Sequence, residues 1–204
     1  HQGSTLALAS SFAPLASICL RHAAQTEELK HVARFDALTG CLNRTTILDT
    51  LEAEYARSER QDHPLSVCFL DLDGFKAIND NHGHLTGDRV LAAVGAALRD
   101  AIREYDSAGR FGGDEFLVVM PETDERDASA IARRLARSVR EHTDAAEGPR
   151  VGATYGVASR GREKAPAKLL ARADARLLKS KGRRARTTRR FSRAVAGGHY
   201  PDAA

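Results

Sequence analysis

The sequence predicts a protein of the α/β class, in which short apolar strands alternate along the chain with amphipathic helices. Residues 65–70 and 116–120 are runs of bulky and β-branched side chains of strand length. Between and after these runs, apolar side chains recur at helical spacing over longer stretches. The chain of 204 residues, 42% of them hydrophobic, has enough material for one domain of ordinary size and an appendage.

The first predicted element is a helix over residues 12–35. We expect residues 1–34 to form a connector arm from an upstream module, and such an arm is able to pair with its copy. The apolar stretch 6–20 is too short to span a bilayer and contains Pro14, so no membrane segment is expected in this fragment.

The remaining elements follow from periodicity and from glycine and proline breaks. A capped loop over 36–44 precedes a helix over 45–58, and a polar, glycine-broken loop over 78–88 follows the first strand. Helices are predicted over 88–103, 125–141 and 168–179. Residues 107–111 are expected to pair with 116–120 as a hairpin, and residues 150–159 form a further strand.

Acidic side chains follow one strand and precede another. Asp71 and Asp73 end the first buried strand, while Asp114 and Glu115 follow the paired glycines of the hairpin turn. Buried carboxylates are costly unless a cation or ligand neutralises them, so this pattern indicates a site for a hard cation. The alternative is a pair of ordinary turns with solvated acids.

The formal charge of +4 is concentrated near the end of the chain. Residues 179–193 contain eight Lys or Arg and no acid, so the rest of the chain carries −4. We expect residues 187–204 to be a basic, disordered tail, and the alternative is contact with nucleic acid or an anionic membrane. Because Phe191 is the only aromatic residue in the basic run, no nucleic-acid partner is expected.

The three cysteines are far apart and lack metal-ligand spacing. We interpret Cys19, Cys41 and Cys68 as reduced packing thiols of a cytoplasmic protein, without a disulfide framework.

Several segments together resemble the signatures of the GGDEF family of diguanylate cyclases. They are 36–44 (DALTGCLNR), 71–76 (DLDGFK) and 112–116 (GGDEF), in family order and at family spacing, with Asn79, Asp80, Gly83, His84, Gly87 and Asp88 between them. The resemblance covers residues 35–186. It implies an α+β fold like the nucleotidyl cyclase and polymerase palm domains, with a central mixed five-stranded sheet flanked by helices.

The resemblance also implies an activity, the synthesis of cyclic di-GMP from two GTP. It makes Asp71 and Asp114 side-chain ligands of Mg²⁺ or Mn²⁺, with the carbonyl of Leu72 as a main-chain ligand and Glu115 beside them. Asp114 and Glu115 are the candidate catalytic residues, and Asp114 is the best candidate to take the proton of the attacking hydroxyl. Since one domain holds one GTP, a homodimer is implied.

Further roles are implied for substrate binding. Backbone amides of Gly74, Phe75 and Lys76 resemble the loop that holds the terminal phosphates. Asn79 and Asp88 match the residues that read the guanine edge, with His84 in the pocket wall, and an amide and a carboxylate suit the acceptors and donors of guanine.

The closing motif departs from the family pattern. Lys181 and Arg183 are candidates for the β- and γ-phosphates. The family usually has two residues between a lysine and a Gly-Arg pair, whereas Lys181 directly precedes Gly182-Arg183 here, and Leu178 stands where a tyrosine is common. Arg184 and Arg186 remain alternatives.

The pair Arg103 and Asp106 resembles the family's inhibitory product site, with Arg134 as a further candidate arginine. Guanidinium groups suit the acceptors and the plane of guanine. An ordinary surface ion pair at i, i+3 is the alternative.

These observations predict a diguanylate cyclase that is inhibited by its product and regulated by an upstream sensor domain, with a loose likeness of residues 1–34 to the end of a GAF domain. A catalytically weak module that senses cyclic di-GMP or GTP is the alternative within the family. A nucleic-acid or membrane interaction protein that acts through its tail is the alternative outside it.

Overall fold

The computed structural model describes residues 34–145, 149–161 and 165–196, with side chains described as far as residue 183. The predicted helix over 12–35 and the GAF likeness therefore lie almost entirely outside the described residues. The elements, in chain order, are α2 (Arg44–Gln61), β1 (Leu65–Asp73), α3 (Phe75–His82), α4 (His84–Ala101), β2 (Ser107–Gly112), β3 (Glu115–Pro121), α5 (Glu125–Ala145), β4 (Gly152–Ser159) and α6 (Pro166–Ala196).

The strands form one antiparallel sheet in the order β2-β3-β1-β4. The α+β class is confirmed, but the described residues give four strands instead of the expected mixed five. A parallel pairing remains only as a single bridge between Leu42 and Gly109 at the sheet edge. The side chain of Asn43 already caps α2 through the amide of Thr46, so little extended chain is left there for a fifth strand.

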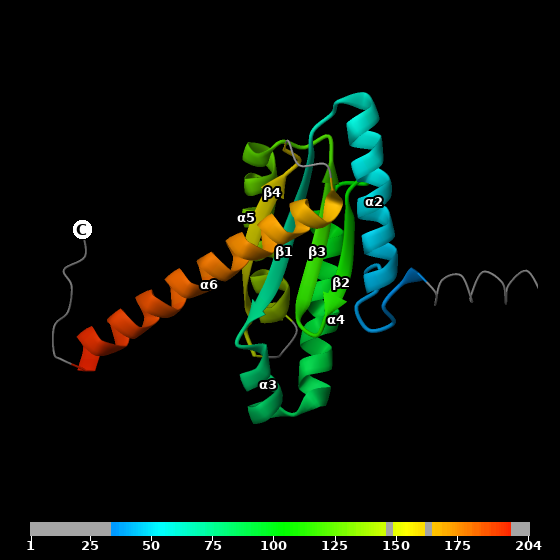
Figure 1. The fold of residues 1–204 in the computed structure, drawn as a ribbon. Coiled ribbons are helices and arrows are strands. Elements are labelled where there is room, and N and C mark those ends of the chain that lie inside the picture. Colours follow the sequence, from blue (N-terminus) through cyan, green and yellow to red (C-terminus); the bar gives the residue numbers. More distant parts are fainter. Residues whose placement is uncertain (1–33, 146–148, 162–164, 197–204) are drawn as a thin grey trace, which may run out of the picture.

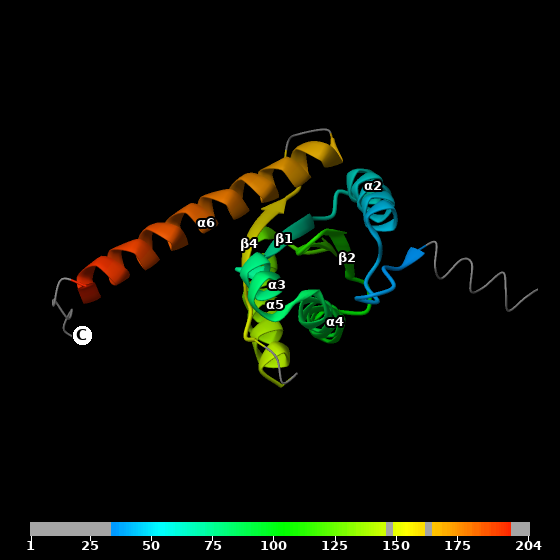
Figure 2. The same ribbon diagram turned by 90° about the horizontal axis from the view of Figure 1, so that it is seen from below.

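Helices cover both faces of the sheet. Figures 1 and 2 show α2 and α6 on one face and α3, α4 and α5 on the other. Alternate residues of β1 enter two different cores: Val67 and Phe69 pack with α2 and α6, whereas Cys68 and Leu70 pack with α4 and α5. The first eight residues of β1 are buried for this reason.

Several predicted boundaries were wrong. Most of the loop expected over 78–88 is instead helical. It contains the end of α3 and the start of α4, which are joined by the single residue Gly83 at φ 81°. The last helix extends beyond residue 179 to Ala196 and therefore includes residues 187–196 of the segment that we expected to be disordered.

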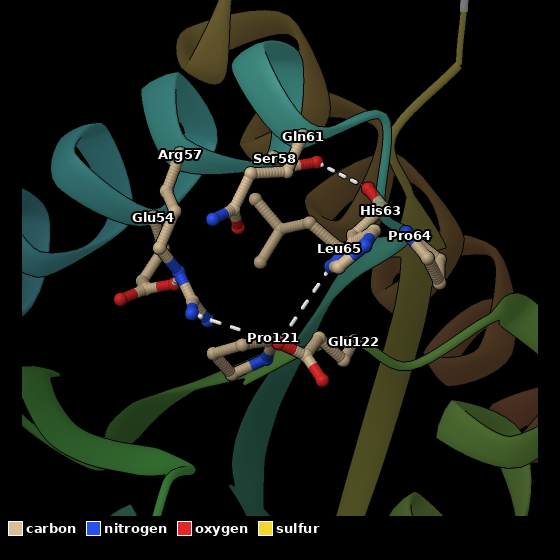
Figure 3. A pocket seen from close by; sticks show the side chains of 9 residues that line it. All are labelled: Glu54, Arg57, Ser58, Gln61, His63, Pro64, Leu65, Pro121 and Glu122. Carbon is tan, nitrogen blue, oxygen red and sulfur yellow. Dashed lines mark hydrogen bonds and ion pairs between the residues drawn. The ribbon is translucent and has the colours of Figure 1, made fainter.

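A shallow depression lies at the end of the sheet where β1 begins and β3 ends. Most of the residues that line it are polar (Figure 3). Arg57 and His63 both lie near Glu122 (3.6 and 3.7 Å), and the Ser58 hydroxyl donates to the His63 carbonyl. Because β1 and β3 are antiparallel, this depression is at the opposite end of the sheet from Asp71 and Glu115.

None of the described helices combines the length and the apolar character needed to cross a membrane.

A close backbone contact sets the position of α6 on the sheet. A Cβ atom added at Gly156 of β4 would lie 2.1 Å from the Ala173 carbonyl oxygen and 2.3 Å from the Leu177 nitrogen. Only a residue without a side chain permits this approach.

We therefore expect Gly156→Ala to lower the free energy of unfolding by about 1–3 kcal/mol, because α6 must move away from the sheet. Urea unfolding would measure the loss. Gly182→Ala is the matched control, since an added Cβ there meets nothing within 4 Å. Equal stability of Gly156→Ala and the parent chain would contradict the contact.

Candidate active site

The acidic ends of β1 and β3 lie side by side. Asp71 is the register partner of Glu115, and the Leu72 amide donates to the Asp114 carbonyl over 3.2 Å. The pairing of two neighbouring strands thus brings together segments more than forty residues apart, as the sequence predicted.

Strand alternation decides which face these carboxylates occupy. Asp71 lies an even number of residues from Val67 and Phe69, and Glu115 lies two residues from Leu117. Both acids therefore lie on the same face of the sheet as these apolar residues, the face covered by α6. Asp73 lies on the same face, and the Thr154 hydroxyl of β4 donates to its carboxylate over 2.5 Å.

The carboxylates of this cluster influence one another. Burial raises the pKa of Asp71, Lys181 opposes the rise, and the charges of Asp114 and Asp73 add to it. Burial also raises the pKa of Glu115, and the nearby charges of Asp71, Asp114 and Asp174 act in the same direction. Burial is thus the main cause of both shifts, and the neighbouring carboxylates add to it.

Hard oxygen donors of this kind suit Mg²⁺ or Mn²⁺. No group of three His, Cys, Asp or Glu side chains in the described part of the chain is arranged as a ready metal cage. The oxygens of Asp71 and Asp114 and the Leu72 carbonyl are of the type that such a cation prefers, and water or phosphate oxygens would have to complete its coordination.

The turn after β1 leads directly into a helix, whose first amides have no acceptor within the helix. Gly74 is the N-cap of α3, at φ 74°, so the amides of Phe75 and Lys76 lie in the first turn of a helix instead of in the predicted loop. Helix N-termini favour anions, so this position suits phosphate groups. Figure 1 shows α3 at the same end of the sheet as the β2–β3 turn.

The predicted guanine-reading residues occupy two adjacent helices. Asn79 lies in α3, its Oδ1 is buried without a hydrogen-bond partner, and a Cβ at Gly87 of α4 would lie 1.9 Å from that oxygen. Gly87 therefore makes room for the Asn79 amide. The next residue of α4, Asp88, is exposed, and His84 is exposed at the start of the helix.

Lys181 and Arg183 occupy different surroundings. The Lys181 Nζ lies 2.5 Å from the Asp71 Oδ2, whereas an Arg183 Nη lies 3.5 Å from the Ser180 Oγ on the exposed side of α6. Lys181 thus contacts the acidic cluster directly through Asp71.

Comparison with known proteins identifies the family. The family model described as "Diguanylate cyclase, GGDEF domain" matches residues 33–187. The chain belongs to the GGDEF family. The segments that carried the resemblance therefore lie within a domain of this family.

Similar proteins include several named cyclases. Diguanylate cyclase DgcS of Shewanella oneidensis is 36% identical over 146 residues, which cover 66% of this chain and 49% of that protein. Diguanylate cyclase DosC of Escherichia coli is 40% identical over 113 residues, 55% of this chain and 25% of that protein. Cyclic di-GMP phosphodiesterase NbdA of Pseudomonas aeruginosa is 38% identical over the same share of the chain and 14% of its own length. The chain spans half or less of the length of these relatives.

Solved structures agree with the fold. The coiled coil and GGDEF domain of DgcB from Caulobacter crescentus, in complex with c-di-GMP, gives a TM-score of 0.73 at 27% identity and covers 85% of this chain and 94% of that one. Diguanylate cyclase SiaD of P. aeruginosa, in complex with its activator SiaC, gives 0.69 at 34% identity, covering 88% and 74%.

The predicted inhibitory residues of this GGDEF domain come together in a turn after α4, which ends at Ala101 instead of at residue 103. Asp106 accepts from the Arg103 amide over 3.1 Å, and Arg134 of α5 donates to the Ala101 carbonyl over 2.8 Å. Asp106 is 5% exposed, and its other oxygen has no hydrogen-bond partner. Burial raises the pKa of Asp106, while the Arg103 amide bond and the charges of Arg103 and Arg134 oppose the rise.

Sequence reasoning missed one positioning residue, Arg110. Its guanidinium donates to the Gly113 carbonyl over 2.9 and 3.0 Å and lies 3.3 Å from the Asp36 carboxylate. Arg110 therefore ties the glycine turn to Asp36 in the loop over 36–44. The sequence feature that could have indicated this role is the position of Arg110 in a strand, two residues before the paired glycines.

Asp36 itself is held by several donors. Burial alone would raise the pKa of Asp36, but hydrogen bonds from Thr39 and the charge of Arg110 outweigh burial and lower it. A lowered folded-state pKa means that the ionised carboxylate stabilises the fold above its unfolded-state pKa. That contribution is lost as the pH falls through the folded-state value.

We therefore expect Asp36→Asn to lower the free energy of unfolding near pH 7 by about 1–2 kcal/mol. The difference from the parent chain should shrink as the pH falls below the ordinary aspartate pKa of 3.8 and through the lower folded-state pKa, because the parent then also loses the charge. Urea unfolding at a series of pH values would measure it. Asp49→Asn, at an exposed position of α2, is the control, and a deficit independent of pH would contradict the electrostatic account.

Proposed function

We propose that this chain is a diguanylate cyclase, which condenses two GTP into cyclic di-GMP and releases two pyrophosphates. The observation that carries the proposal is the pairing of Asp71 with Glu115, which puts the carboxylates of two distant motifs at one point of the sheet. Membership of the GGDEF family and relatives named as diguanylate cyclases support it.

The chain's own residues supply positioning and proton transfer. Asp71, Asp114 and the Leu72 carbonyl would hold Mg²⁺ or Mn²⁺, which when bound neutralises charge on the phosphoryl oxygens and lowers the pKa of the attacking hydroxyl. The 3′-oxygen of one GTP forms a bond to the α-phosphorus of the other, and the bond from that phosphorus to pyrophosphate breaks. The reciprocal attack by the second 3′-oxygen closes the ring and releases the second pyrophosphate. Asp114 accepts the hydroxyl proton, with Glu115 beside it.

The substrate would lie between the acidic cluster and the α3–α4 pair. The carboxylate of Asp88 suits the ring N–H and amino group of guanine, and the buried Asn79 amide suits its acceptors. The first amides of α3 and the ammonium of Lys181 are available for the terminal phosphates. Arg183 would have to turn away from Ser180 to join them.

Catalysis would need two copies of the chain, because each domain holds one GTP and the two triphosphates must meet face to face. A two-fold homodimer satisfies this requirement. The wider regulation that we propose includes an upstream sensor domain, which would control how the two domains meet.

We expect Asp114→Asn to reduce formation of cyclic di-GMP by about 10²-fold or more, because it removes a cation ligand and the proton acceptor. Purified chain would be incubated with GTP and Mg²⁺ or Mn²⁺, and the nucleotides separated. Asp49→Asn, an exposed acid far from the site in sequence, should retain parental activity. Absence of product from the parent chain at high protein concentration would overturn the proposed function.

A second candidate function is that of a cyclic di-GMP sensor with weak catalysis. The observation that favours it is the Arg103–Asp106 turn, in which a buried carboxylate oxygen without a partner lies near two arginines, Arg103 and Arg134. The exposed Arg103 guanidinium is available to the bases of a bound dinucleotide, and the same contact would give product inhibition in an active cyclase.

We expect Arg103→Ala to weaken cyclic di-GMP binding about tenfold or more, since a guanidinium–guanine contact is lost. Calorimetry with the dinucleotide would measure this, with Arg126→Ala, at an exposed position of α5, as control. Binding lost in Arg103→Ala, in a chain that makes no product, would favour the sensor. Unchanged binding would exclude this turn as the product site.

A further inference from the structure

Lys181 reaches into the acidic cluster from α6. Its Nζ lies 2.5 Å from the Asp71 Oδ2, and its side chain is 40% exposed while that of Asp71 is 10% exposed. The pair therefore joins a half-exposed, flexible ammonium to a nearly buried carboxylate. An ammonium is a compact charge with three donors, and the carboxylate oxygen that it contacts is one that a hard cation would use.

The helix that carries Lys181 is held firmly. Leu177 is 2% exposed and packs against the sheet, and Gly156 allows the backbone of α6 to approach β4. Asp174 and Lys181 lie three residues before and four residues after Leu177, so both belong to the face of α6 that meets the sheet. The backbone thus positions the lysine, while its four-carbon stem leaves the ammonium free to move a few ångströms.

The acidic cluster brings several carboxylates close to one another and to Lys181. Carboxylates of Asp71, Asp114 and Glu115 are close enough to influence one another, and Asp174 adds to the field at Glu115. Lys181 acts against this charge at both Asp71 and Glu115. A divalent cation at Asp71 would meet the ammonium at the same oxygen, where the two positive charges repel.

We propose that Lys181 is an exchangeable counter-ion of the divalent-cation site, which holds Asp71 in the nucleotide-free chain and leaves it when the cation and the nucleotide arrive. The proposal rests on the proposed function in one respect, since the phosphates of GTP give the displaced ammonium a new partner. Cation binding is then weakened in the free chain and strengthened by nucleotide. By linkage, nucleotide binding is strengthened by the cation to the same extent.

The test measures Mn²⁺ binding to the nucleotide-free chain by electron paramagnetic resonance or calorimetry. We expect Lys181→Met, which keeps the length of the side chain and removes its charge, to bind Mn²⁺ about fivefold or more tightly than the parent. Lys179→Met is the matched control, because it removes the same charge from an exposed position of α6, and its affinity should stay near that of the parent. Lys181→Gln provides a second neutral variant if the methionine variant does not fold.

Two further measurements test whether the gain in Mn²⁺ affinity depends on Asp71 and on the nucleotide. Asp71→Asn in the Lys181→Met background should abolish the gain in Mn²⁺ affinity. A non-hydrolysable GTP analogue should raise Mn²⁺ affinity by a larger factor in the parent than in Lys181→Met.

Equal Mn²⁺ affinities of Lys181→Met, Lys179→Met and the parent, or a gain that survives Asp71→Asn, would overturn the proposal. Because binding is measured without turnover, its outcome is separate from the cyclase assay. A chain with the expected Mn²⁺ affinities that makes no cyclic di-GMP would refute the proposed function and leave the role of Lys181 standing.

Discussion

The hydrogen-bonded register between β1 and β3 is the constraint on which the site depends. It sets Asp71 opposite Glu115 and joins the Leu72 amide to the Asp114 carbonyl. Because side chains alternate between the faces of a sheet, a slip of one residue would turn Asp71 towards α4 and α5. The apolar residues of β1 enter two separate cores, so such a slip would also misplace Val67 and Phe69. The same packing that stabilises the sheet therefore positions the acids.

The concentration of negative charge at one end of this sheet has a cost that neighbouring elements partly offset. Burial and mutual repulsion raise the pKa of Asp71 and Glu115, and Lys181 contributes the opposing charge. Its position follows from the close contact of α6 with Gly156 of β4. A backbone contact without side-chain chemistry thus determines where a charged group lies. The helix α6 therefore both packs on the sheet and carries the lysine that lies against its acids.

The glycine turn of the GGDEF motif is supported from outside the hairpin. Arg110 connects the Gly113 carbonyl to Asp36, and the Arg99 guanidinium of α4 donates to the Thr39 carbonyl in the same loop. The loop over 36–44 is therefore bonded to both the hairpin and a helix. A turn with two adjacent glycines has few conformational restraints of its own, so the bond from Arg110, which also pairs with Asp36, restrains the Gly113 carbonyl.

Local patterns were enough to predict most of the elements, because apolar period and glycine breaks act over a few residues. Both strands of the site, the hairpin and the acids at their ends were predicted in this way, and the motif spacing identified the family. Other features depend on contacts between distant segments. These include the all-antiparallel order of the sheet, the replacement of the 78–88 loop by a helical turn at Gly83, the choice of Lys181 over Arg183 at the acids, and the Arg110–Asp36 bond. No local pattern encodes which elements pack together, and that packing decides which charged side chains meet.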